Sequence, residues 1–170
     1  MAKLVYRIND LEHLKEITYN NYLVVRAMED VPTGIRKKLL EALFNMNPNA
    51  WNVIGITHEA LLVFKKHRYK KVSGMGINRS HKISRAEQYK EMLFDNEAFK
   101  SKYYNKESFW AHYIDGDATI LATSSENMKN NFSRVYPIPE ESDLFKTRGF
   151  AWKHGSDEID FLKQLWKKVK

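Results

Sequence analysis

The sequence contains no cysteine and no run of eighteen apolar residues. Without cysteine, disulfides and thiolate zinc sites are excluded, so any metal ligand has to be His, Asp, Glu, Asn or a backbone oxygen. Such ligands favour a hard cation, Mg²⁺ or Mn²⁺. Without a long apolar run, no membrane span is expected, and the charged start MAKLVYRIND does not fit a secretory signal. We therefore expect a cytoplasmic protein with no membrane partner.

Length and hydrophobic content set the expected organisation of the chain. The 170 residues, 43% of them hydrophobic, suffice for one sizeable core but are too few for two ordinary domains. We therefore predict one compact domain over residues 1–170. Alternating strand and helix signals place it in the α+β class, with a strand-strand-helix element and several surrounding helices.

Acidic residues are almost absent between Lys65 and Lys90. This basic segment holds nine Lys and Arg residues against Glu87 alone, a balance of +8, whereas the other 144 residues hold 19 basic and 20 acidic side chains. So local an excess is typical of a surface that binds a polyanion, although a solvated lysine-rich face is the alternative. The predicted nucleic-acid contacts are Lys65, Lys66, Arg68, Lys70, Lys71, Arg79, Lys82 and Arg85.

Capping signals and hydrophobic periodicity predict the secondary structure. Helices are expected at 9–17, 33–46, 58–69, from 84, after 108, from 123 and from 156, the last capped by Ser156. Strands are expected at 4–8, 50–56, 118–123 and at both sides of the GMG turn, in YKKVS and INRSHKI. Residues 22–28 fit either a strand or a buried helix. The pair of helices around residues 50–56 also fits a helix-turn-helix, the best non-enzymatic alternative.

Two fragments stand out in this order of elements: NRSHKIS, within residues 77–85, and DATILATSSENMKNN, residues 117–131. A strand with a histidine, then a strand, then a capped helix with asparagines resembles the HNH (ββα-metal) endonucleases. The second fragment is especially similar to the nuclease segment of RNA-guided CRISPR effectors. The resemblance implies hydrolysis of a phosphodiester bond with Mg²⁺ or Mn²⁺ as cofactor. Hydrolysis of this kind needs a base for the attacking water and a cation for the growing charge.

The resemblance assigns roles to particular residues. His81 would be the general base, and Asn127 would contact the metal, with Asn131 one turn further on the same helix face. Family members often carry an acid before the histidine, where this chain has Ser80, and Ala118 stands where an asparagine is expected. Asp117 would supply the missing carboxylate if its turn points inward.

The remaining histidines and aromatic residues have simpler interpretations. His67 is predicted to contact phosphate or lie on the surface. His154 is predicted to cap or pack, and a distal ligand or a phosphate contact is the alternative. The four tryptophans are expected mainly in the core, whereas Tyr69 and Tyr89 lie among basic residues, where they could stack on bases.

These observations predict three kinds of function. The first is a metal-dependent nucleic-acid endonuclease of restriction or mobile-element type. The second is a non-catalytic DNA- or RNA-binding regulator or inhibitor that uses the basic segment. The third, a protein-interaction module, leaves the concentration of charge unexplained. Nucleic acid is the expected partner, with DNA placed ahead of RNA.

Overall fold

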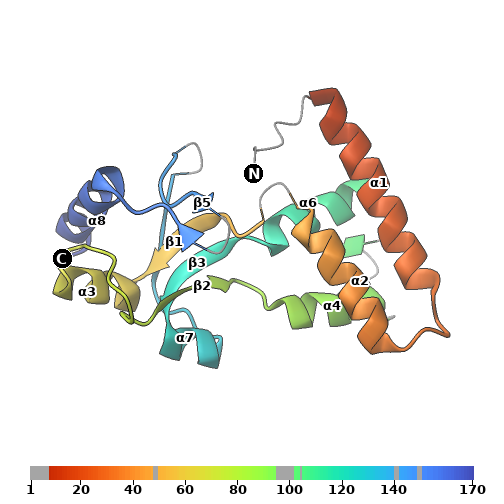
Figure 1. Cartoon of the computed structure of the whole chain (residues 1–170), viewed down its shortest axis with the longest axis horizontal. Coiled ribbons are helices and arrows are strands. Elements are labelled where there is room, and N and C mark those ends of the chain that lie inside the picture. Colours follow the sequence, from red (N-terminus) through yellow and green to blue (C-terminus); the bar gives the residue numbers. More distant parts are fainter. Residues whose placement is uncertain (1–7, 48–49, 95–101, 104, 140–141, 149–150) are drawn as a thin grey trace. The chain divides into compact units, whose positions relative to one another are not determined.

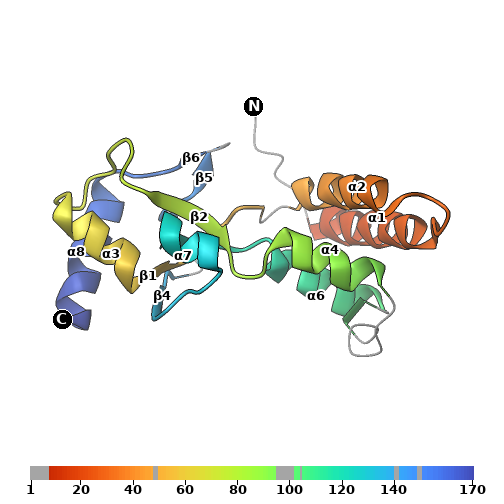
Figure 2. The ribbon, with the colours of Figure 1, turned by 90° about the horizontal axis from the view of Figure 1, so that it is seen from below.

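The structure is a computed structural model that describes residues 8–47, 50–94, 102–103, 105–139, 142–148 and 151–170. The chain forms two compact units (Figures 1 and 2). Unit 1 comprises Met1–Ala50 and Ile83–Asp117, and unit 2 comprises Trp51–Lys82 and Ala118–Lys170. Helices and a mixed sheet are both present, so the α+β class is confirmed. The single domain over residues 1–170 stays a prediction.

The described part of unit 1 is helical. It contains α1 (Ile8–Ala27), α2 (Thr33–Asn45), α4 (Arg85–Leu93) and α6 (Lys106–Gly116). Helix α1 buries a set of side chains three or four positions apart, which is the spacing of one helix face: Leu14, Thr18, Tyr22 and Val25. Of residues 22–28, which fitted strand or helix in the sequence, all but Met28 therefore belong to α1.

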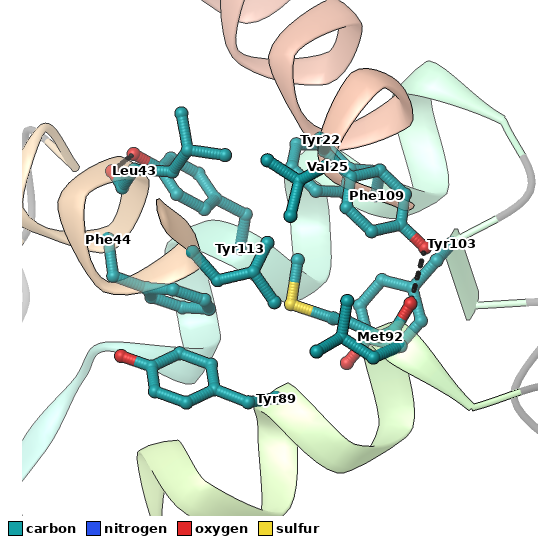
Figure 3. Packing of buried hydrophobic residues seen from close by; sticks show 11 residues of the cluster. Tyr22, Val25, Leu43, Phe44, Tyr89, Met92, Tyr103, Phe109 and Tyr113 are labelled. Atoms are coloured by element: carbon teal, nitrogen blue, oxygen red, sulfur yellow. Dashed lines mark hydrogen bonds between the residues drawn. The ribbon is translucent and has the colours of Figure 1, made fainter. Parts of the chain in front are cut away.

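Aromatic side chains fill the core of unit 1 (Figure 3). Phe109 stacks on Tyr22 with ring centroids 4.8 Å apart and on Tyr113 at 5.6 Å. The Tyr22 hydroxyl donates to the Met92 carbonyl at 3.2 Å, and the Tyr113 hydroxyl donates to the Leu43 carbonyl at 2.6 Å. Both tyrosines thus add apolar contact area while their hydroxyl groups are hydrogen-bonded.

Unit 2 is built on a four-stranded sheet with the order β2-β3-β1-β4. Its strands are β1 (Val53–Thr57), β2 (Ile77–His81), β3 (Thr119–Thr123) and β4 (Val135–Pro137). Strands β1 and β3 are parallel, whereas β2 and β4 run antiparallel to their neighbours. The other elements are α3 (His58–Lys66), α7 (Ser124–Lys129), α8 (Ser156–Val169) and the hairpin of β5 (Thr147–Arg148) and β6 (Ala151–Trp152).

Helices α3 and α8 lie side by side in both views (Figures 1 and 2) and share a core with the sheet. The most deeply buried members of this core are Ile56, Leu61, Phe64, Leu121, Phe145 and Leu162. Strand β1 lies between β3 and β4, and its Gly55 permits this close pairing. A Cβ atom at Gly55 would lie 2.7 Å from Val135 Cγ1 and 3.2 Å from the Tyr136 carbonyl oxygen.

Local capping signals are confirmed at α3, α4 and α7 and are wrong at α2, which begins after Pro32 without a side-chain cap, and at α8. Thr57, Ser84 and Thr123 accept hydrogen bonds from the first turns of α3, α4 and α7. Helix α8 is not capped by Ser156. The backbone N–H of Gly155 donates instead to the Glu158 carboxylate at 2.6 Å, so a donor at the start of the helix has a hydrogen-bond partner.

Two predictions about residues 50–73 are wrong. The helix-turn-helix alternative fails because Val53–Thr57 form β1, hydrogen-bonded to strands on both sides, so α2 and α3 are not joined by a turn. Residues 69–73 form no strand, and only the segment after the GMG turn pairs, as β2 with β3. The strand predicted at 4–8 falls almost entirely outside the described residues. None of the described helices is long and apolar enough to cross a membrane.

Candidate nucleic-acid interface

The positive charge of the chain is concentrated in unit 2. This unit holds 16 of the 28 Lys and Arg residues and 8 of the 21 Asp and Glu residues, a balance of +8, whereas unit 1 balances at −1. Most of the basic segment, from Lys65 to Lys82, lies in unit 2. A polyanion would therefore be attracted to this unit.

The end of α3 presents a first group of cations. Lys65 and Lys66 occupy the last turn, where positive charge suits the helix dipole, and both are exposed. The following turn brings Arg68 and Lys70 to the surface, with Arg68 at a φ of 55° and Tyr69 at 61°. The Lys65 ammonium lies 4.1 Å from the ring centroid of Trp166 in α8.

A second group combines cations with tryptophan rings. The Lys71 ammonium lies 3.7 Å from the ring centroid of Trp152, and the Arg79 guanidinium lies 5.0 Å from that of Trp51. The ring of His81 also approaches the Trp51 ring, with centroids 4.4 Å apart. These five residues, Trp51, Lys71, Arg79, His81 and Trp152, are called the tryptophan-cation cluster below.

The two cations of the tryptophan-cation cluster are both partly shielded from water. The Lys71 side chain is exposed, but its ammonium lies against the indole of Trp152, where it is partly shielded from water. This burial lowers the pKa of Lys71, and the positive charge of Arg79 lowers it further. Burial also lowers the pKa of Arg79. Among the described residues, no carboxylate pairs with Lys71, so an anion placed between the two cations would relieve their repulsion.

Arg85 differs from the other predicted contacts. It belongs to unit 1, where its guanidinium Nη2 lies 2.8 Å from Asp117 Oδ1 and its Nε donates to the same oxygen at 2.9 Å. Its Nη1 donates to Asn45 Oδ1 at 3.1 Å. Asp117 is fully buried, so the inward orientation expected of it is present, but its carboxylate binds a guanidinium. Lys82, in contrast, is exposed.

The strand-strand-helix element is present, but its predicted site residues lie apart. His81 pairs with Thr119 at the start of β3, whereas α7 begins after Thr123, which pairs with Ile77. At about 3.3 Å per residue, His81 and the start of α7 are separated by roughly 13 Å along β2.

His81 and the start of α7 also lie on different faces of the sheet. Side chains alternate along a strand, so His81 shares the face of Ile77 and Arg79, and Asn78 lies on the other. Asn78 Nδ2 donates to Ser124 Oγ at 3.1 Å, which places the start of α7 on the face opposite His81. The structure does not bring His81 and the α7 asparagines together.

The asparagines of α7 lie at the surface. Asn127 and Asn131 are exposed, and Asn130 ends the helix in the left-handed conformation with a φ of 46°. Across the part of the chain that the structure describes, no three His, Asp or Glu side chains are grouped so that they could hold a metal ion. The metal-binding roles of Asn127, Asn131 and Asp117 therefore stay predictions.

Packing and hydrogen bonds within the protein surround two further histidines, His67 and His154, and two tyrosines, Tyr69 and Tyr89. His154 stacks on Phe64 at 5.3 Å and donates from Nε2 to the Tyr69 carbonyl at 2.9 Å, and burial lowers its pKa. His67 ends α3, where its backbone N–H bonds to carbonyls of the last turn. Tyr89 is buried in the core of unit 1, so the expectation that it stacks on bases is wrong, and Tyr69 packs against the core of unit 2.

The tryptophans are the functional candidates that the sequence did not identify. All four were expected mainly in the core, yet none is fully buried, and three carry a Lys or Arg over the ring. Their partners lie 28 to 101 positions away in the chain, as in Arg79 with Trp51 and Lys65 with Trp166. Trp152 is followed by Lys153, but no Lys or Arg lies near Trp51 in the sequence, so no local signal could have found the Trp51 pair.

Comparison with protein-family models, curated proteins and solved structures gives no significant match to this chain.

Proposed function

We propose that the chain binds nucleic acid through the cations and tryptophans of unit 2. The observation that carries the proposal is the pairing of Lys65, Lys71 and Arg79 with indole rings of the same unit. Cations bind phosphates, and aromatic faces bind bases, so their combination on one unit suits a nucleic acid better than it suits an acidic protein. The local balance of +8 supports the same partner.

The test is a titration of fluorescent oligonucleotides with the whole chain at increasing salt. Single-stranded DNA, duplex DNA and RNA are compared at each salt concentration. Binding that displaces counterions makes the logarithm of affinity fall linearly with the logarithm of salt concentration. The expected result is measurable binding at low salt that weakens with this dependence. Absence of binding at low salt, or binding independent of salt, would overturn the proposal.

Metal-dependent hydrolysis by an HNH-like site is the second candidate function. The observation that favours it is the element order: β2 with His81, antiparallel β3, and a helix that begins with a capping box. The distance between His81 and α7, and their positions on opposite faces, weigh against it. Asn127 and Asn131 would hold Mg²⁺ or Mn²⁺ as cofactor in this candidate.

Hydrolysis is tested by incubation of plasmid DNA and of RNA with the protein and Mg²⁺, Mn²⁺ or EDTA. If His81 is the general base, His81→Ala should reduce cleavage by about 10²- to 10⁴-fold. Asn127→Ala should raise the metal concentration needed, since it removes a ligand. No cleavage with either metal, or full cleavage by both variants, would exclude the HNH-like mechanism while leaving the binding proposal intact.

A further inference from the structure

The tryptophan-cation cluster has features that favour one form of nucleic acid. Its members come from the segment before β1, from the loop after α3, from β2 and from β6. Three contacts are present among them: Lys71 lies over Trp152, Arg79 lies over Trp51, and the ring of His81 lies beside that of Trp51. Each of the two indoles therefore carries a cation over its ring.

The backbone of Trp51 is held in an uncommon conformation. Its φ is 61°, in the left-handed region that bulky residues rarely adopt. Such strain persists only where surrounding contacts maintain it, and it concentrates at ligand sites. Here the Trp51 carbonyl accepts hydrogen bonds from Thr119 Oγ1 at 3.2 Å and from Arg79 Nη1 at 3.5 Å, so strand residues hold the Trp51 backbone in this conformation.

The ammonium over Trp152 shows that a ring face is within reach of an incoming group. An ammonium is strongly hydrated and lies at the end of a flexible four-carbon side chain. It can leave the ring at small cost and move to a phosphate, while a flat base takes its place on the indole. The same exchange suits the guanidinium over Trp51, which stacks on planar groups as well.

We infer that Trp51 and Trp152 stack on unpaired bases while Lys71 and Arg79 hold phosphates of the same strand, so that the ligand is single-stranded nucleic acid. The inference rests on the proposed binding function and specifies its ligand. In a duplex, the faces of each base are covered by neighbouring base pairs, so an indole cannot reach them without unstacking. A strand with unpaired bases offers both the face and the phosphate to the cluster.

The experiment compares three ligands of equal length on the unaltered protein: a single strand, a duplex, and a single strand whose nucleotides are abasic. The abasic strand keeps every phosphate and lacks every base. Stacking of each base predicts tighter binding of the complete strand, by about 5- to 100-fold over the abasic strand. Equal affinity for the complete and abasic strands, or tighter binding of the duplex, would overturn the inference while the proposed function stands. Failure of all three to bind at low salt would instead overturn the proposed function.

Tryptophan variants test which indoles cause the preference for the complete strand over the abasic strand. Trp152→Leu and Trp51→Leu should each remove most of the preference for the complete strand and leave affinity for the abasic strand unchanged. Trp110→Leu, an indole of unit 1, is the matched control and should keep the preference. Loss of the preference in Trp110→Leu, or its retention in both cluster variants, would assign the stacking elsewhere. Because the ligand comparison needs no variant, a variant that fails to fold does not remove the test.

Discussion

Single cations of the basic segment have different surroundings, and these decide what each can do. The Lys71 ammonium lies over an indole at the surface, whereas the Arg85 guanidinium binds the buried Asp117 carboxylate. A charge that is already paired inside a unit is costly to separate from its partner and is not available to a phosphate. Sequence alone cannot separate the two cases, because Asp117 lies 32 positions from Arg85.

Arg85→Ala should therefore act on stability. It leaves the Asp117 carboxylate buried without its cation, which should lower the free energy of unfolding by about 3–5 kcal/mol. Urea denaturation at neutral pH measures this change. The exposed Lys82 is the control, and Lys82→Ala should change the free energy of unfolding by less than about 0.5 kcal/mol. Weaker nucleic-acid binding with unchanged stability would return Arg85 to the predicted interface.

His154 predicts a pH dependence of stability. Burial lowers its pKa below the ordinary value of 6.5, so the unfolded chain takes up this proton more readily than the folded one. Stability from this group is present above pH 6.5 and is lost as pH falls through the lowered pKa of the folded state. The free energy of unfolding should thus decline below about pH 6.5.

His154→Phe separates this contribution from others, because phenylalanine keeps the stack on Phe64 and does not titrate. Between pH 7 and about 5.5, the free energy of unfolding should fall more steeply for the natural protein than for the variant. Glu158 has a lowered pKa and acts below its ordinary 4.5, outside this window. Parallel curves for the two proteins would contradict the assignment to His154.

At the scale of elements, two parallel strands end in the same way. Strands β1 and β3 each end in a threonine that caps the helix that follows, α3 or α7. One carboxylate oxygen of Glu126 accepts from Thr57 Oγ1 at 2.8 Å and from Thr123 Oγ1 at 2.9 Å. The starts of both helices are therefore held by a single buried side chain, and the asparagine that follows it faces solvent.

This arrangement predicts that substitutions at two neighbouring residues, Glu126 and Asn127, change stability by different amounts. Glu126→Ala leaves two threonine hydroxyls without their acceptor and should lower the free energy of unfolding by about 1–3 kcal/mol. Asn127→Ala, the matched control one position on, should change it by less than about 0.5 kcal/mol because its side chain is exposed. Chemical denaturation of both variants measures these changes in the free energy of unfolding. A cost at Asn127 equal to that at Glu126 would mean that the asparagine is a structural residue.

The elements that the sequence predicted correctly are those with local signals. Capping by Thr57, Ser84 and Thr123 depends on residues three positions away, and all three are present. The extension of α1 through residues 22–27 depends instead on packing, since Tyr22 and Val25 face the core of unit 1. Strand pairing also needs distant partners, which is why residues 50–56 fitted a connector as well as a strand.

The candidate site was predictable only in part, for the same reason. The basic segment is a local feature, and its surface cations from Lys65 to Lys71 follow from composition. The tryptophan-cation cluster joins Trp51, Arg79 and Trp152, which meet through the sheet and the hairpin of unit 2. Likewise, the separation of His81 from α7 follows from the register of β2 with β3, which no local pattern specifies.

At the scale of the whole molecule, charge divides the chain between its units. Unit 2 carries +8 and unit 1 carries −1. A polyanion should therefore sense a difference between cations of the two units, even where both are exposed lysines. Removing a given number of positive charges from unit 1 changes the net charge of the molecule as much as removing them from unit 2, but it removes no predicted phosphate contact.

The most direct test of the binding proposal compares two triple variants with the same loss of charge. One replaces Lys65, Lys66 and Lys70 of unit 2 by alanine, and the other replaces Lys37, Lys38 and Lys90 of unit 1. The measurement is the slope of log affinity for an oligonucleotide against log salt concentration. Each lost phosphate contact should flatten it by about 0.7 for a single strand or 0.9 for a duplex. The account predicts a slope flatter by roughly 2 to 3 for the unit 2 variant only. Equal slopes for the two variants would contradict it.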